Sequence, residues 1–395
     1  MRSQGSLPGW TVVLAALALV GALSACNGGD ESTDSSVDMP TAFGVLGQAD
    51  FAHAAANRGV ALSASGISQP LGGVATDGSK LYLVDSGNNR ILGWNSLPAN
   101  GAAADFVIGQ DGFGASAPGT GNTRLALPAS VHIANGRLIV ADSGNNRVLI
   151  WNSLPTANVP ANVVVGQAGF NTADPGTSAT GLSFPVAAVV GNNRLIVSDQ
   201  NNNRVLIWNT LPSASGAPAD VVIGQADFGL TEAGEQEDGL SLPAGLWSDG
   251  FRLLVADSGN NRVMYWTQLP RSNLADASYV IGQSDFARVS AAAGQASLRA
   301  PYGLASDGTR IYVADSGNNR VLVFDTFPIA NGALAFEVYG QESFTARTPN
   351  DDNQDGTSDD GPGARTLSSP TGVSYASGVL YVSDRNNHRV LLFPS

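Results

Sequence analysis

The stretch DSGNNRV at residues 142–148 decides the fold, because it returns five more times along the chain. Identical copies begin at Asp257 and Asp315, a copy ending in isoleucine begins at Asp85, and variants begin at Asp199 (DQNNNRV) and Asp384 (DRNNHRV). The arginines of the six heptads lie 57, 57, 58, 58 and 69 residues apart. A nearly constant interval of this length is typical of repeat architectures.

Each repeat contains four short β-rich runs in a fixed order. An apolar run after a proline leads to a DG or NG turn and to a second run such as RIYVAD (310–315). The heptad follows, then an aromatic-ended run such as VLIWN (148–152), and then a run that ends in GQ-x-x-F. β-Branched runs separated by turn residues predict a four-stranded antiparallel sheet. Such a sheet has two apolar faces, which the radial stacking of several sheets covers.

The phase of the repeat predicts the number of blades and the way the ring closes. GQ-x-x-F occurs six times, beginning at Gly47, Gly109, Gly166, Gly224, Gly282 and Gly340. The first copy precedes every heptad, whereas the last repeat has no fourth run after Phe393. The sequence therefore predicts an all-β, six-bladed β-propeller of four-stranded antiparallel blades over residues 42–395, with the last blade closed by the N-terminal strand.

The stretch VADSGNNRVLIW (140–151) and its counterparts resemble NHL repeats, and the resemblance covers nearly all of residues 42–393. It implies a six-bladed propeller. It implies little about function, because propellers of this family include extracellular sensor domains, protein-binding modules, RNA binders and a few lyases.

We interpret the heptad as a structural device, because a binding site rarely needs six equivalent copies. Its Asp precedes a tight reversal in which Gly or Asn can take a positive φ, and its Arg begins the returning strand. The carboxylate can accept turn amides while the Arg reaches back to it or to the neighbouring blade. The residues concerned are Asp85, Arg90, Asp142, Arg147, Asp199, Arg204, Asp257, Arg262, Asp315, Arg320, Asp384 and Arg389. The aromatic residue that ends each third run is expected to pack between blades.

The first residues predict export and lipidation. An apolar run of secretory length ends in LSAC (23–26), which resembles a bacterial lipobox. We expect a lipoprotein signal peptide at 1–25, a lipid on Cys26 and a disordered acidic tether at 26–41. The alternative is an ordinary signal peptide with an incidental cysteine. By resemblance to Gram-negative sorting, Asn27 after Cys26 implies the outer membrane of the cell envelope, on its periplasmic or surface face.

The charge of the chain excludes one class of partner. The formal net charge is -13 and Lys80 is the sole lysine. Such a surface repels phosphate backbones, so we expect no nucleic-acid binding. We expect a monomer that contacts a membrane through its lipid anchor only.

Two connections between blades depart from a regular length. Four of them span fifteen positions from the Phe of GQ-x-x-F to the next Pro, but Phe51 to Pro70 spans nineteen and Phe344 to Pro370 spans twenty-six. Long loops on a rigid scaffold are where binding sites usually lie. The two irregular connections adjoin across the closure, and residues 345–368 are the predicted main contact for a ligand.

The longer connection holds an acidic stretch that resembles a DxDxDG calcium loop. Its candidate ligands are Asp351, Asn353, Asp355, Thr357 through its carbonyl, and Asp359, with Gly356 at the sharp turn. Pro362 stands where an EF-hand has its bidentate glutamate, and no helices flank the loop. Ca²⁺ binding and a merely solvated acidic insertion both remain open.

The leading functional prediction is a lipid-anchored, extracytoplasmic binding or scaffolding module that uses its inter-blade loops. Its partner, whether a protein, a glycan or a small molecule, is not specified by the sequence. The alternative is a metal-dependent lactonase or lyase with its site in the central channel. That alternative needs several ligands on the innermost strands, where His132 is the single candidate and reads as a packed core residue. No nucleophile with a partner base is apparent, so no catalytic residue is predicted.

Overall fold

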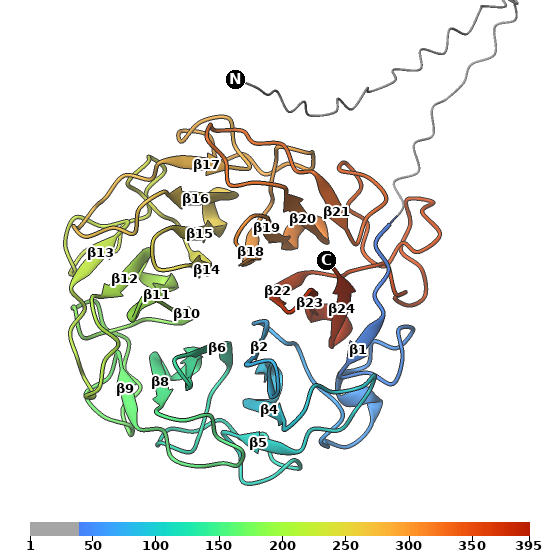
Figure 1. Ribbon diagram of the computed structural model, residues 1–395, viewed down its shortest axis with the longest axis horizontal. Coiled ribbons are helices and arrows are strands. Elements are labelled where there is room, and N and C mark those ends of the chain that lie inside the picture. The colour runs from blue at the N-terminus through green and yellow to red at the C-terminus, as the bar shows by residue number, and fades with distance from the viewer. Residues whose placement is uncertain (1–38) are drawn as a thin grey trace, which may run out of the picture. The chain divides into compact units, whose positions relative to one another are not determined.

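The computed structural model describes residues 39–395. These residues form six four-stranded antiparallel sheets around a central axis (Figure 1), which confirms the predicted six-bladed propeller. Within the described range, no helix has the length and apolar character that a membrane span requires.

The blades follow one another along the chain, and each first strand lies innermost (Figure 1). Blade 1 contains β2 (Val74–Thr76), β3 (Leu81–Asp85), β4 (Arg90–Trp94) and β5 (Phe106–Ile108). Blade 2 contains β6 (Pro128–Ala134), β7 (Arg137–Asp142), β8 (Arg147–Trp151) and β9 (Val163–Val165). Blade 3 contains β10 (Pro185–Gly191), β11 (Arg194–Asp199), β12 (Arg204–Trp208) and β13 (Val221–Ile223).

Blade 4 contains β14 (Pro243–Ser248), β15 (Leu253–Asp257), β16 (Arg262–Trp266) and β17 (Tyr279–Ile281). Blade 5 contains β18 (Pro301–Ser306), β19 (Ile311–Asp315), β20 (Arg320–Phe324) and β21 (Glu337–Tyr339). Blade 6 contains β22 (Pro370–Ala376), β23 (Val379–Asp384) and β24 (Arg389–Pro394), and its outer strand is β1 (Gly44–Leu46).

The ring closes through β1, as the phase of the repeat predicted. This strand pairs antiparallel with β24, so that Gly44 lies opposite Leu392 and Leu46 lies opposite Val390. The first and last strands of the domain therefore share one sheet, at the right of Figure 1.

The core lies between the blades, because successive residues of a strand point to opposite faces of its sheet. In blade 1, Tyr82 and Ile91 pack in a cluster with Trp151 of blade 2, whereas Leu83 belongs to a cluster with Leu392 of blade 6. The aromatic residues that end the third strands are almost fully buried; they are Trp94, Trp151, Trp208, Trp266, Phe324 and Phe393.

Antiparallel pairing gives the ring two distinct faces. The connection face carries the turns between second and third strands and the long connections between blades. The turn face carries the turns between first and second strands and the loops between third and fourth strands. The first face holds every heptad.

Candidate functional site

Each heptad adopts the same local structure on the connection face. In blade 1, Asp85 ends β3, the single-turn 3-10 helix η2 (Ser86–Asn88) reverses the chain, and Arg90 begins β4. The residue before each Arg has a left-handed backbone with φ between 50° and 55°, a region that Asn adopts readily. The other turns are η3 (Ser143–Asn145), η4 (Gln200–Asn202), η5 (Ser258–Asn260), η6 (Ser316–Asn318) and η7 (Arg385–Asn387), while η1 (Ala56–Gly59) lies in the first connection.

The Asp and Arg of every heptad form a fully buried ion pair. The Arg90 Nε donates to Asp85 Oδ2 at 2.6 Å, and the five other pairs have the same geometry at 2.7 Å. All twelve side chains have 0% relative exposure. Residues with no access to solvent cannot touch a ligand, so the heptad positions the connection face from beneath.

Each Arg also holds the connections on both sides of its blade. Arg90 donates to the carbonyl oxygens of Ser63 at 2.8 Å and Gly66 at 3.0 Å in the preceding connection, and to Phe113 at 2.6 Å in the following one. The other oxygen of Asp85 accepts the amide of Ser68 at 2.7 Å. One buried pair therefore fixes the backbone of two neighbouring loops.

The GQ-x-x-F motif docks onto the heptad of its own blade, a link that sequence reasoning did not anticipate. In blade 1, the Gln110 amide donates to the carbonyls of Asn89 at 2.8 Å and Ala117 at 3.0 Å, and the Phe113 carbonyl is the acceptor for Arg90. Gly109 has φ +90°, and a Cβ there would lie 2.5 Å from the Leu125 side chain. The sequence did hold a signal for this contact, because the two motifs follow each other in a constant order and a contact between them would recur in every blade.

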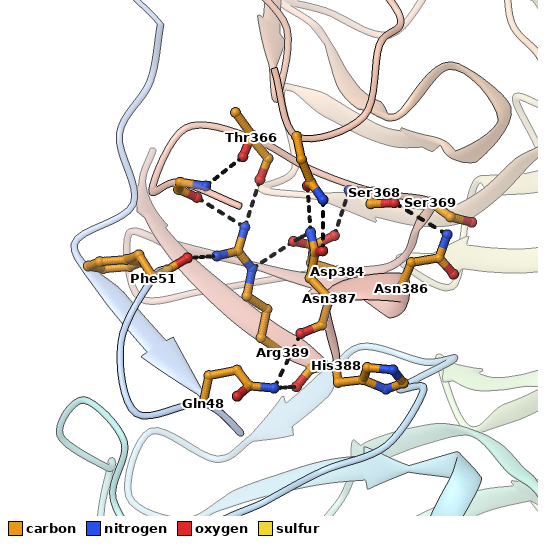
Figure 2. Close-up of polar contacts among 12 residues, drawn as sticks. Gln48, Phe51, Thr366, Ser368, Ser369, Asp384, Asn386, Asn387, His388 and Arg389 are labelled. Atoms are coloured by element: carbon orange, nitrogen blue, oxygen red, sulfur yellow. Dashed lines mark hydrogen bonds and ion pairs between the residues drawn. The ribbon is translucent and has the colours of Figure 1, made fainter. Parts of the chain in front are cut away.

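At the closure, these two motifs come from opposite ends of the domain (Figure 2). Arg389 donates to Asp384 at 2.7 Å and to the carbonyl of Phe51 at 2.5 Å, and Gln48 donates to the carbonyl of His388 at 3.0 Å. Arg389 also donates to Gly363 and Thr366, at 3.0 and 2.9 Å, in the long 345–368 connection. The two irregular connections therefore meet at a single buried arginine.

Burial sets the electrostatics of these pairs. Desolvation raises the pKa of the Asp257 carboxyl to about 6, although the attraction of Arg262 and the hydrogen bonds from Ser241 and Asn260 oppose the shift. The carboxylate is thus ionised at neutral pH, and Arg262 offsets the cost of burying its charge.

The acidic stretch of the long connection is folded by its own backbone amides. Asp351 accepts the amides of Asp355 at 3.1 Å and Gly356 at 2.9 Å, and Asp359 accepts the amide of Asp352 at 2.7 Å. Thr357 donates its amide to Asp355 at 2.9 Å. Among residues 39–395, no three His, Cys, Asp or Glu side chains are grouped so that they could hold a metal ion.

The central channel contains a cavity of about 320 Å³ that the first strands of all six blades line. His132, Trp247, Tyr302 and Tyr375 face it, and no charged side chain or cysteine of the described residues lines it. His132 lies on β6, which borders the cavity, and its side chain is partly buried there. Desolvation lowers the pKa of His132 to about 4, with a partial opposing effect from the Val190 backbone, so the imidazole is neutral at pH 7.

Two residues of the predicted 26–41 segment remain to be placed. Cys26, the predicted lipidation site, lies outside the described residues. Met39, within the predicted tether, is buried at 5% exposure and contacts Gln354 of the long connection.

His388 replaces the asparagine of the other heptads and supports a prediction about pH. In blade 1, Asn89 Oδ1 accepts the amide of Leu127 at 2.7 Å, and in blade 6 the His388 Nδ1 accepts the amide of Gln69 at 2.9 Å. Protonated imidazole cannot accept this bond. Desolvation lowers the pKa of His388, with Arg385 adding to the shift and Asp384 opposing it.

Because the unfolded state then binds the proton more tightly, stability is lost as pH falls below about 6.5. We expect His388→Asn to flatten the decline of the melting temperature between pH 7 and 5. The change corresponds to one hydrogen bond, about 0.5–1.5 kcal/mol. Differential scanning fluorimetry at several pH values measures it, and equal slopes for the two proteins would refute the assignment.

Comparison with known proteins agrees with this architecture. The NHL repeat model matches residues 367–393, which include the last heptad. No curated protein sequence matches the chain.

Among solved structures, virginiamycin B lyase from Staphylococcus aureus is 11% identical over 85% of this chain and 98% of its own, with a TM-score of 0.46. An auxiliary nutrient binding protein from Bacteroides thetaiotaomicron is 12% identical over 82% of this chain and 69% of its own, with a TM-score of 0.47. The WD40 propeller of Doa1 is 10% identical over 82% and 78%, with a TM-score of 0.46. Likenesses at this level assign no activity. The chain is a six-bladed β-propeller that carries an NHL repeat in its last blade.

Proposed function

We propose that this protein is a lipid-anchored, extracytoplasmic propeller that binds a partner through its connection face. The observation that supports this is the buried network beneath that face, which holds every connection in place and joins the two irregular ones at Arg389. Loops held on a rigid scaffold lose little conformational entropy when a ligand binds. The partner is a protein, a glycan or a small molecule, and the protein acts as a monomer in the cell envelope, anchored to the outer membrane through Cys26.

The long connection offers a way to test the proposal without disturbing the scaffold. Asn350 bonds to Asn387, and Gly363 bonds to Arg389, so residues 351–361 can be removed while both contacts remain. The Asp359 amide reaches the Asn350 carbonyl at 3.0 Å, so the ends of the deleted segment are close enough for a short glycine link.

A photo-crosslinking side chain placed at Asp355 in living cells should yield a discrete adduct. The same group at Ser79, in a turn of the turn face, is the matched control. We expect adducts from Asp355 and from other positions on the connection face. When 351–361 is deleted, the adducts from those other positions should disappear while the melting temperature stays unchanged. Adducts from both faces alike, or unchanged adducts after the deletion, would contradict the proposal.

Calcium bound by the 351–359 loop is part of this proposal and has its own test. After dialysis in calcium-containing buffer, mass spectrometry should find about one calcium per chain, and Asp351→Asn with Asp355→Asn should remove it. Calcium that binds only the folded state should also raise the melting temperature of the parent and not of the variant. A tightly held metal that survives in the variant would point to the central channel and favour the lactonase or lyase alternative.

A further inference from the structure

The first strands of the six blades come into backbone contact at the connection-face end of the central channel. A Cβ added to Gly72, Gly245 or Gly372 would clash with the backbone of the next first strand around the ring. The side chains that follow the opening prolines are buried at this level and belong to one apolar cluster, against which Tyr302 packs; they are Leu71, Ala129, Val186 and Ala244. The channel is therefore closed at this end.

The other end of the channel opens on the turn face. Along blade 2, Ala129 is 1% exposed, His132 further along β6 is partly exposed, and Asn135 in the turn is exposed. Blade 6 shows the same order, from buried Thr371 through partly exposed Tyr375 to the exposed turn. The cavity of about 320 Å³ is therefore a blind pocket, and its entrance lies on the side of the ring opposite to the connection face.

Backbone polar groups form much of the wall of this pocket. Within residues 39–395, the inner edge of each first strand pairs with no other strand, so every second residue directs its N–H and C=O toward the channel. Two of these amides are bonded by side chains: Ala188 donates to Ser130 Oγ and Val74 donates to Ser374 Oγ, both at 3.2 Å. Each of these hydroxyl groups keeps a hydrogen to donate. Donors and acceptors thus alternate around the space.

Two aromatic rings border the pocket in fixed positions. Trp247 packs on Phe327 with ring centroids 5.2 Å apart, and Tyr375 stacks on Tyr312 at 5.9 Å. Rings that are held in this way lose little conformational entropy when a ligand binds. Together with the neutral imidazole of His132, they complete a lining to which the described residues contribute no charged side chain.

This lining selects one class of ligand. An ionised ligand would lose its hydration without gaining a counter-ion. A purely aromatic ligand would leave the strand edges without water or a partner, and each unpaired group costs free energy. A sugar meets both demands, because its hydroxyl groups donate and accept while its C–H faces pack on aromatic rings. Small-molecule pockets begin at about 300 Å³, so this one suits one or two sugar rings.

We propose that the central channel binds a neutral sugar of one or two rings, which enters from the turn face. Trp247 and Tyr375 hold the ring faces of the sugar, while Ser130, Ser374 and His132 bind its hydroxyl groups together with the strand edges. The site goes beyond the proposed function, because partner capture uses the connection face. One chain can then hold a sugar and a partner at the same time.

Isothermal titration calorimetry of the full chain with glucose, maltose, cellobiose and lactose tests the class of ligand. We expect at least one of these sugars to bind, and to bind at least about tenfold more tightly than glucuronate, whose carboxylate finds no counter-ion in the pocket. Indole, which has no hydroxyl groups, should bind more weakly than that sugar. No binding by any of the four sugars overturns the inference, and so does equal or tighter binding of glucuronate or indole.

Variants that exchange equivalent residues of the blades test the location. Val189 of β10 occupies the position of Trp247 in β14, and His132 occupies it in β6. Val189→Trp should fill the pocket and lower the affinity at least about tenfold, and His132→Val should weaken binding by removing a hydrogen-bonding group. Leu242→Trp adds the same ring to the connection face and is the matched control, which should bind the sugar like the parent. Parent affinity in both channel variants overturns the assignment.

The deletion of residues 351–361 separates this site from the connection face. We expect it to leave the sugar affinity unchanged, although it should abolish partner capture. Loss of sugar binding in the deletion, while Val189→Trp still binds, would place the sugar among the connections and overturn the channel site. Partner capture that persists in the deletion, while the sugar result holds, would refute the proposed function alone.

Discussion

Replacing Arg204 by alanine is expected to lower the free energy of unfolding by about 3–5 kcal/mol, because the change leaves a buried carboxylate without its counter-ion. Arg204 has no exposed surface and donates to Asp199 at 2.7 Å. It also donates to Gly181 at 3.0 Å and to Phe228, in the connections on either side of blade 3. Those carbonyls lose their donors as well, which adds to the cost. Thermal or urea unfolding, followed by tryptophan fluorescence, measures the effect.

Three related variants show what the effect depends on. Arg288→Ala removes an exposed pair with Asp285, at 3.1 Å, and should cost less than about 1 kcal/mol. Arg204→Lys should recover little of the loss, since an ammonium group lacks the planar fork that serves several acceptors. The double variant with Asp199→Ala removes the stranded charge but not the unpaired carbonyls, so it should remain destabilised. A double variant as stable as the parent would refute the structural role of the heptad.

Removing residues 1–51 is expected to prevent the domain from closing. The deletion takes away β1, and with it Val45 and Leu46, which are each 1% exposed in the parent. Burial of side chains of this size contributes about 1.5–3 kcal/mol each, and the whole stability of a domain is about 5–15 kcal/mol. The loss also exposes the edge of β24, which invites pairing with other chains. We expect aggregation or a broad transition, seen by gel filtration and thermal unfolding.

A shorter deletion provides the control for this experiment. Removal of residues 1–38 leaves every described contact and should yield a protein with a sharp transition. A peptide that spans residues 39–51 should restore the truncated domain by adding the missing strand, as in strand-complementation complexes. If residues 52–395 alone unfold at the same temperature as residues 39–395, then β1 is not the closing element.

The fold was predictable because the same pattern of short β-rich runs and turns occurs six times in the sequence. The spacing of the arginines predicted the blades, and the GQ-x-x-F copy that begins at Gly47, before the first heptad, predicted the closure. A repeat does not show which of its parts are in contact, so the docking of Gln110 and Phe113 onto the Arg90 turn became visible only in three dimensions. Single departures from the repeat were harder still. The phenyl rings of Phe43 and Phe336 look like ordinary β-strand residues until their exposure is known.

The cavity was also beyond prediction. The first strands read as apolar runs, and a run of small residues on six converging strands can either fill the axis or leave space around it. The volume of about 320 Å³ arises because glycine, alanine and serine share the innermost positions with Trp247 and Tyr302. Whether the His132 side chain faces that space depends on the register of β6, because a shift of one residue would turn it to the other face of the sheet.

The closing strand also has a mechanical meaning. Phe43 precedes β1, which lies antiparallel to β24, and the hydrogen bonds between the two strands stand across the line of β1. A pull along that line loads the hydrogen bonds between β1 and β24 together, as in shear, rather than one after another, as in peeling. Past the other end of β1, the bonds of Gln48 and Phe51 with the last heptad act as a stop. A pull that enters the domain at Phe43 along β1 is therefore resisted by all of these bonds together, and the ring stays closed.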